Sequence, residues 1–208
     1  MYLEILSDRQ RELLPLIAQF RRSFYLVGGT AIALHIGHRR SIDFDLFTAK
    51  KLNKSRIKQK IFELSCSKKT LFDDIDQLHF YINEIRTTFF YYPYPVEHPE
   101  KLEGVISMPS LLSLATMKAF ALGRRAKWKD YVDLYFLLKD YFSIKDISLA
   151  ADKIFGPLFS EKLFRLQLAF HEDIDHAEPV EYMPGFEVDE QEVKNFLIDK
   201  SLQEICSP

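Results

Sequence analysis

The sequence has few of the features that mark secreted or membrane proteins. It contains only two cysteines among 208 residues, Cys66 and Cys206, and their spacing matches no metal-binding motif. We therefore expect two free thiols in a reducing compartment. The first residues, MYLEILSDRQ, carry charges where a signal peptide would be apolar, and no run of about 18 apolar residues occurs. These absences predict a soluble, cytoplasmic protein that does not enter a membrane.

An excess of charge is also lacking, because the formal net charge is only −2. Nucleic acid would have to be bound by a local basic patch rather than by the whole molecule. One such patch is Lys50–Lys60, with six basic residues and no acidic one, which is either a solvated helix face or a contact for nucleic acid or a triphosphate. Conversely, His171–Glu192 holds nine acidic residues and no Lys or Arg. That segment either serves solubility or folds against the basic patches.

The stretch from Tyr25 to Phe47 combines two patterns that suit phosphate chemistry, and the first is a turn. A short apolar run ending at Val27 predicts a buried strand, Gly28-Gly29 end it, and the residues from Thr30 onward predict a helix. A glycine turn at a helix start offers free backbone N–H groups to an anion. By itself, such a turn is more often only a tight connection.

The second pattern in this stretch is an alternation of apolar and acidic residues. Because successive side chains of a strand point to opposite faces, Ile42, Phe44 and Leu46 are predicted to face the core, with Asp43 and Asp45 side by side on the other face. Two carboxylates held so close favour a cation between them. Such oxygen ligands suit Mg²⁺, which completes its shell with substrate phosphates. Together, the turn and the acidic pair indicate a nucleotide-phosphate enzyme.

The remaining sequence predicts a sheet followed by helices. Leu71–Tyr92 is strand-rich, with a hairpin turn at Asn83-Glu84, and Leu102–Ile106 predicts one further short strand. From Pro109 the pattern becomes helical, and a last helix is expected over Glu190–Ile205. This change in pattern divides the chain into an α/β domain over residues 1–108 and a helical domain over residues 109–208.

A lysine interrupts the apolar stripe of the first predicted helix in the second half. Its apolar face follows a helical spacing and includes Leu111, Leu114, Ala115, Lys118 and Leu122. A buried ammonium group is costly unless it meets an anion. The partner of Lys118 is therefore either an aspartate in a structural ion pair or a nucleotide phosphate. Downstream lie a basic cluster over residues 124–129 and two acidic residues, Asp130 and Asp133, on one helical face.

These motifs resemble the AbiEii/AbiGii toxin family of the nucleotidyltransferase superfamily. The superfamily signature is a glycine-rich strand-to-helix turn followed by D-x-D on the next strand, and GGTAIALHIGHRRSIDFDLF is similar to it. The pattern K-x(6)-R-x(3)-K-D-x-x-D-L, which begins at Lys118, resembles later motifs of the family, as does YMPGFEVDEQEVKNFL near the C-terminus. The resemblance implies a nucleotidyltransferase-type mixed sheet with flanking helices, followed by a helical half.

The resemblance also implies a function. It predicts an enzyme that transfers a nucleoside monophosphate from Mg-NTP to an acceptor, with RNA, and a tRNA end in particular, as the leading candidate. It further implies a bacterial toxin–antitoxin or abortive-infection system with a cognate antitoxin. By resemblance, Mg²⁺ would be held by Asp43 and Asp45. The phosphates would be held by Gly28, Gly29, Thr30, Arg39, Arg40 and Lys118.

One part of the superfamily pattern is missing. A third carboxylate usually lies on a later strand beside the D-x-D, but the residues from Ile85 to Val96 include no Asp or Glu. Asp130, from the helical half, is the candidate to replace it as a catalytic residue. Two alternatives therefore remain open: an NTP-binding pseudoenzyme without transfer activity, and a non-catalytic RNA- or protein-interaction factor that uses residues 50–60 and 124–129 as its surface.

Overall fold

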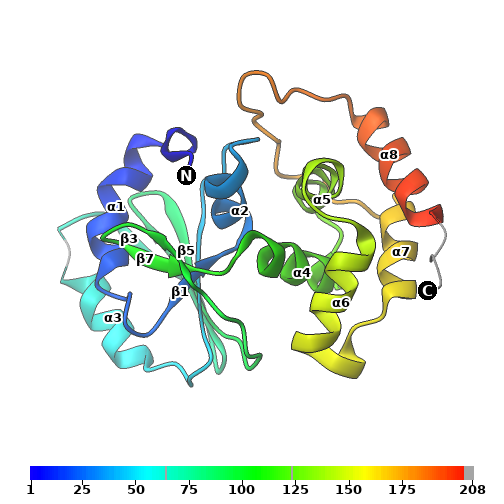
Figure 1. The fold of residues 1–208 in the computed structure, drawn as a ribbon. Helices are drawn as coiled ribbons and strands as arrows, with labels where there is room; N and C mark the ends of the chain where they lie inside the picture. The colour runs from blue at the N-terminus through cyan, green and yellow to red at the C-terminus, as the bar shows by residue number, and fades with distance from the viewer. Residues whose placement is uncertain (64, 123, 204–208) are drawn as a thin grey trace. The chain divides into compact units, whose positions relative to one another are not determined.

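The computed structural model describes residues 1–63, 65–122 and 124–203, and these divide into two compact units. The first unit is Met1–Ser110 and the second is Leu111–Pro208 (Figure 1). Among the described residues, no helix is both long enough and apolar enough to cross a membrane. Of the two cysteines, Cys66 is a half-buried free thiol, and Cys206 lies outside the described residues.

A mixed five-stranded sheet forms the centre of the first unit, which confirms the predicted architecture. The strand order is β1-β2-β5-β4-β3, with β2 and β5 parallel and the other neighbours antiparallel. The strands are β1 (Tyr25–Val27), β2 (Phe44–Thr48), β3 (Lys68–Asp74), β4 (Gln77–Ile82) and β5 (Ile85–Tyr91). A separate antiparallel pair is formed by β6 (Glu100–Leu102) and β7 (Ile106–Met108).

The helices of the first unit flank this sheet (Figure 1). They are η1 (Leu3–Ile5), α1 (Asp8–Ala18), α2 (Gly28–Ile36) and α3 (Lys54–Phe62). A capping box starts α1: the Ser7 hydroxyl accepts from the Gln10 backbone N–H, and the Gln10 side chain accepts from the Ser7 backbone N–H. The side-chain nitrogen of Gln10, Nε2, takes no part in the capping box and donates to the backbone oxygen of Ser41 at 2.8 Å.

The two faces of the sheet differ in character. One face is apolar and includes Phe44, Leu46, Leu78, Phe80 and Phe89, all fully buried. The Phe89 ring meets the rings of Phe20, Phe24 and Phe80 at centroid distances of 4.8, 5.3 and 6.3 Å. The opposite face, called the Asp45 face below, is more polar. By strand alternation it carries Asp45 and Phe47 of β2, Arg86, Thr88 and Phe90 of β5, and Gln77, His79 and Tyr81 of β4.

The predicted hairpin turn is confirmed, whereas two other local predictions are wrong. Asn83 and Glu84 join β4 to β5 with φ of 49° and 66°, the left-handed pair that a tight two-residue hairpin requires. The single strand expected over residues 102–106 is instead a turn between β6 and β7. Ile42 does not face the core but is 55% exposed, because β2 begins only at Phe44 and strand alternation does not extend back to it.

The second unit is helical, as the sequence predicts from Pro109 onward. Its helices are α4 (Leu111–Leu122), α5 (Trp128–Asp140), α6 (Ile144–Phe155), η2 (Gly156–Leu158), α7 (Glu161–Ala169) and α8 (Glu190–Leu202). The rings of Phe120 and Phe155 stack at 3.8 Å and tie α4 to α6. The acidic segment connects α7 to α8, which begins at Glu190 as predicted.

Candidate functional site

The turn between β1 and α2 brings a carboxylate to the start of a helix. Val27 pairs with Asp45 in the antiparallel register of β1 and β2, so the next residue, Gly28, lies beside the Asp45 side chain. A Cβ atom built on Gly28 would collide with Oδ2 of Asp45. Gly28 also has φ +74°, in the left-handed region that favours glycine. Only glycine allows both the turn and the approach of Asp45.

The N-terminus of α2 is suited to negative charge. Val27 occupies the N-cap position and makes no side-chain capping hydrogen bond, so the first N–H groups of the helix are not capped by it. The first turn contains no acidic residue. Since the helix dipole places partial positive charge at this end, the Asp45 carboxylate and any added phosphate are stabilised there.

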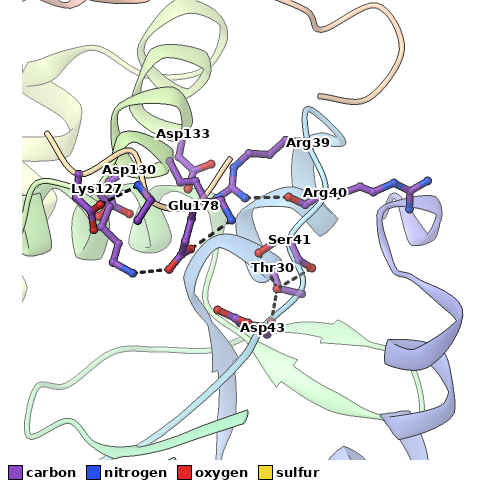
Figure 2. Close-up of polar contacts among 12 residues, drawn as sticks. Thr30, Arg39, Arg40, Ser41, Asp43, Lys127, Asp130, Asp133 and Glu178 are labelled. Carbon is purple, nitrogen blue, oxygen red and sulfur yellow. Dashed lines mark hydrogen bonds and ion pairs between the residues drawn. The ribbon is translucent and has the colours of Figure 1, made fainter. Parts of the chain in front are cut away.

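Thr30 fixes the segment that carries Asp43. Its hydroxyl lies within hydrogen-bonding range of the Asp43 backbone oxygen and, at 3.0 Å, of the Ser41 hydroxyl (Figure 2). The amide of Gln10 holds the Ser41 backbone oxygen from the other side. Thr30 itself is 2% exposed. The Thr30 hydroxyl therefore positions the backbone at Asp43, while the predicted contact of Thr30 with phosphate stays a prediction.

Arg39 and Arg40, which the family resemblance predicts to hold phosphates, make different contacts. Arg39 is 2% exposed, and its Nη2 atom lies 2.5 Å from where a Cβ of Gly29 would be, so Gly29 makes room for this guanidinium at the first turn of α2. Its Nη1 atom donates to the Arg40 backbone oxygen at 3.0 Å (Figure 2). Arg40 donates to the Glu4 backbone oxygen at 3.3 Å, at η1.

The aspartate pair fits a magnesium ion that brings further ligands with it. Asp43 and Asp45 are both half-exposed, at the start of β2 and beside the first turn of α2. Among the described residues, no group of three or more His, Cys, Asp or Glu side chains could hold a metal. Two carboxylates with substrate phosphates are a usual set of Mg²⁺ ligands, so the donor chemistry is adequate only when a phosphate is bound.

Strand β5 places no carboxylate beside this pair. Its residues on the Asp45 face are Arg86, Thr88 and Phe90, and Thr88 lies directly opposite Asp45. His79 of β4 lies opposite Thr88 in turn. Burial lowers the pKa of His79 and the Arg86 guanidinium lowers it further, while Asp45 acts in the opposite direction. The sequence analysis missed Arg86 and His79, because only the pairing of β2 with β5 and of β5 with β4 places them on the same face of the sheet as Asp45.

Lys118 belongs to an ion-pair cluster inside the second unit. Its Nζ atom lies 2.7 Å from Oδ1 of Asp130 and 2.8 Å from Oδ2 of Asp133, and the exposed fractions of the three side chains are 5%, 3% and 0%. Of the two partners that the sequence left open, the structure favours an aspartate over a phosphate. Lys118 therefore joins α4 to α5 through two buried carboxylates.

Asp130 is engaged on both carboxylate oxygens. Besides Lys118, it accepts from Nε of Arg125 at 2.9 Å. Burial alone would raise the pKa of Asp130, but the charges of Lys118 and Arg125 outweigh it and lower that pKa below its usual value. An ionised carboxylate with two cationic partners is a structural group in this unit. Its predicted role as a replacement for the third carboxylate stays a prediction.

The acidic segment folds against the basic cluster, which was one of its two predicted roles. Glu178 lies 2.7 Å from Lys127 and 3.3 Å from Lys129 (Figure 2). The hydrogen bond from Lys127 is the main cause that lowers the pKa of Glu178 to about 2. Backbone bonds from Asp175 to Ala126 and from Trp128 to Asp175 fix the contact at 2.7 and 3.0 Å. The cluster over residues 124–129 is thus partly neutralised and is a weaker surface for RNA.

Comparisons with known proteins give the family of the chain. Residues 16–107 match a family model described as nucleotidyl transferase AbiEii toxin, type IV TA system. The uncharacterised protein aq_aa25 of Aquifex aeolicus is 36% identical over 155 residues, which cover 71% of this chain and 75% of that protein.

Solved structures support the fold. A putative nucleotidyltransferase from H. pylori has a TM-score of 0.56 at 21% identity, and the match covers 92% of this chain and 91% of that one. MenT4, a nucleotidyltransferase toxin from Mycobacterium tuberculosis, has a TM-score of 0.62 at 12% identity, with 92% and 81% covered. The chain therefore has the nucleotidyltransferase fold that the sequence predicted.

The buried cluster around Lys118 makes a prediction about stability. Lys118→Met preserves the volume of the stem but removes a buried cation from Asp130 and Asp133, and it should cost about 3–5 kcal/mol, the usual loss when one partner of a buried ion pair is removed. Thermal and urea unfolding of the full chain measure this loss. Lys153→Met, at an exposed position of α6, is the control and should change stability little. If Lys118→Met is as stable as the control, the ion-pair interpretation is wrong.

Proposed function

Because the chain belongs to the AbiEii nucleotidyltransferase toxin family, and is therefore a nucleotidyltransferase, we propose that it transfers a nucleoside monophosphate from Mg-NTP to RNA, with a tRNA end as the leading acceptor. One observation carries this proposal. The Asp45 carboxylate lies against Gly28 at the start of α2, with Asp43 tied into place just before it. Carboxylates for a metal and N–H groups for phosphates thus meet at a single turn.

In this proposal, some residues of the first unit bind the metal and others bind the phosphates. Asp43 and Asp45 would hold Mg²⁺, which when bound neutralises charge on the triphosphate and favours departure of pyrophosphate. The first-turn N–H groups at Gly28 and Gly29 would face the phosphates, with Arg39 close to Gly29 as a positive neighbour. In the reaction, an acceptor hydroxyl oxygen bonds to the α-phosphorus, and the bond from the α-phosphorus to the bridging oxygen of pyrophosphate breaks.

The second unit has a supporting part in this proposal. We assign residues 1–108 to the nucleotidyltransferase-like domain and residues 109–208 to a helical domain. Lys118 and Asp130, both predicted as site residues, would contribute through the stability of the helical domain, since each is held by ion pairs within it. The assignment of catalysis to the first unit agrees with the family match, which covers residues 16–107.

The acceptor surface is proposed on the basic segment at α3. Lys50, Lys51 and Arg56 are exposed there, whereas Lys54 and Lys58 both pair with Asp73, at 2.6 and 2.5 Å. Three exposed cations are available for RNA phosphates, which bind mainly through such charges. The charge pattern that the sequence left open thus favours a nucleic-acid contact at these three residues.

The family description implies a second kind of partner. A toxin of a type IV toxin–antitoxin system acts with a cognate antitoxin, and we propose such a partner and a bacterial cytoplasmic setting for this chain. A pseudoenzyme that binds Mg-NTP without transfer is the second candidate function. The observation in its favour is that β5 presents Arg86 and Thr88, and no carboxylate, beside Asp45.

A first experiment tests the aspartate pair. Asp43→Asn and Asp45→Asn should each abolish Mg²⁺-dependent NTP binding, measured by calorimetry with each of the four NTPs, because each removes a charged metal ligand. Thermal stability should be preserved, since both side chains are half-exposed and carry no core packing. Asp152→Asn, at an exposed position of α6, is the matched control. Wild-type binding of Mg-NTP by both variants would refute the metal assignment.

A second experiment tests the acceptor surface. Changing Lys50, Lys51 and Arg56 together to Gln should weaken RNA binding and lower the slope of log affinity against log salt by about 0.7 for each RNA phosphate that is no longer neutralised. Affinity for Mg-NTP should stay unchanged, because these residues lie outside the aspartate pair and the turn at α2. The matched control replaces exposed cations of the second unit, Lys145, Lys153 and Lys162. An unchanged salt slope in the α3 variant would mean that this segment is only a solvated face.

A further inference from the structure

Arg86 occupies the part of the sheet where a third carboxylate was expected. Three residues of neighbouring strands lie in one row across the Asp45 face: Asp45 of β2 pairs with Thr88 of β5, and Thr88 pairs with His79 of β4. Arg86 precedes Thr88 by two residues and therefore points to the same face. A guanidinium, rather than a carboxylate, is thus the charged group that β5 contributes beside the aspartate pair.

The contacts of Arg86 do not neutralise its charge. Its Nη2 atom donates to Nδ1 of His79 at 3.3 Å, while its Nε atom is buried and has no hydrogen-bond partner among the described residues. No Asp or Glu within the described ranges forms an ion pair with Arg86. A guanidinium stays protonated in proteins and has five donors. A half-buried cation with a buried, unsatisfied donor is costly unless an anion binds to it.

His79 orients this guanidinium without acting as its counter-ion. Because Arg86 has only donors, Nδ1 of His79 must accept, which leaves the ring proton on Nε2. That atom lies 3.0 Å from Oε1 of Gln77 and donates to it. Both nitrogens of the neutral ring are therefore used, and the chain Gln77–His79–Arg86 holds the guanidinium on the Asp45 face.

Phosphate is the anion that fits this arrangement. The planar fork of an arginine binds two phosphate oxygens at once, which an ammonium group does not. Thr88 lies between Asp45 and His79 in the row, so His79, which holds the guanidinium, is two strand spacings, ~10 Å, from Asp45 on the same face. A nucleotide held by the aspartate pair carries three phosphates in a row, and the one that extends across β5 would be the one that Arg86 binds.

We propose that Arg86 binds a phosphate group of a nucleotide substrate on the Asp45 face, with His79 as its positioning residue. The inference rests on the proposed function, since it assigns a further residue to the same site. The phosphate comes either from the NTP or from the RNA acceptor, and both offer the same chemistry to the guanidinium. Arg86 thus supplies positive charge where other nucleotidyltransferases are expected to carry their third carboxylate.

The test uses the full chain and two probes, inorganic tripolyphosphate without metal and each Mg-NTP. Arg86→Gln should weaken binding of tripolyphosphate and of Mg-NTP by roughly 10- to 100-fold, the loss for one charge-assisted hydrogen bond, with an unchanged melting temperature. The affinity of Arg86→Lys for both probes should lie between those of the wild type and Arg86→Gln, because lysine keeps the positive charge but lacks the planar fork of donors. Arg22→Gln, exposed in the same unit, is the control and should bind like wild type.

The role of His79 is tested by a double-mutant cycle. His79→Phe removes the acceptor that orients Arg86, so it should weaken tripolyphosphate binding in the wild-type background and have no further effect in Arg86→Gln. Equal losses in both backgrounds would remove His79 from the proposal, because a merely structural effect does not depend on Arg86.

The outcomes separate this inference from the proposed function. If Asp45→Asn loses Mg-NTP while Arg86→Gln binds both probes like Arg22→Gln, the inference is wrong and the proposed function stands. If Arg86→Gln loses tripolyphosphate but Asp45→Asn binds Mg-NTP like wild type, the anion site stands and the metal assignment fails. If Arg86→Gln loses tripolyphosphate and a 5′-phosphorylated RNA oligomer while keeping Mg-NTP, the phosphate belongs to the acceptor.

Discussion

The close approach of the Asp45 side chain to the backbone at Gly28 is the constraint that fixes the geometry of the candidate site. It requires a glycine with positive φ, because any Cβ would collide with Oδ2 of Asp45. It also requires the register that pairs Val27 with Asp45 across β1 and β2. The hydroxyl of Thr30 and the amide of Gln10 then fix the segment before β2, so the backbone that carries Asp43 is held by contacts from two helices.

Arg86 differs from cations in both units that have carboxylate partners, such as Lys54 and Lys58, which pair with Asp73. In the second unit, buried and half-buried charges are matched internally: Lys118 with two aspartates, and Lys127 and Lys129 with Glu178. In the first unit, Arg86 has no carboxylate partner among the described residues and remains half-buried. Internally matched charges stabilise a fold, whereas unmatched ones on a sheet face are suited to a charged substrate. This difference supports placing the chemistry in the first unit.

Local sequence patterns were sufficient to predict much of this structure. The strand, glycine turn and helix at Tyr25–Ile36 and the hairpin at Asn83-Glu84 each depend on neighbouring residues, and the structure contains them. Asp43 precedes β2, so its placement side by side with Asp45 stays a prediction. Arg86 and His79 could not be found in this way, because only the pairing of β5 with both β2 and β4 places them on the face that carries Asp45. For Lys118, spacing predicted a buried partner but could not distinguish aspartate from phosphate. The prediction that Ile42 faces the core was wrong, because the alternation of strand side chains was extended to a residue that precedes β2.

Transfer of the nucleotide itself is the most direct test of the central claim. The full chain would be incubated with Mg²⁺, total bacterial RNA and, in turn, each NTP labelled at the α-phosphate, and label in the RNA fraction would be measured together with released pyrophosphate. Nucleotidyl transfer predicts label on RNA with at least one NTP and one pyrophosphate released for each nucleotide transferred. Binding of Mg-NTP with no labelled RNA and no pyrophosphate from any of the four would contradict it.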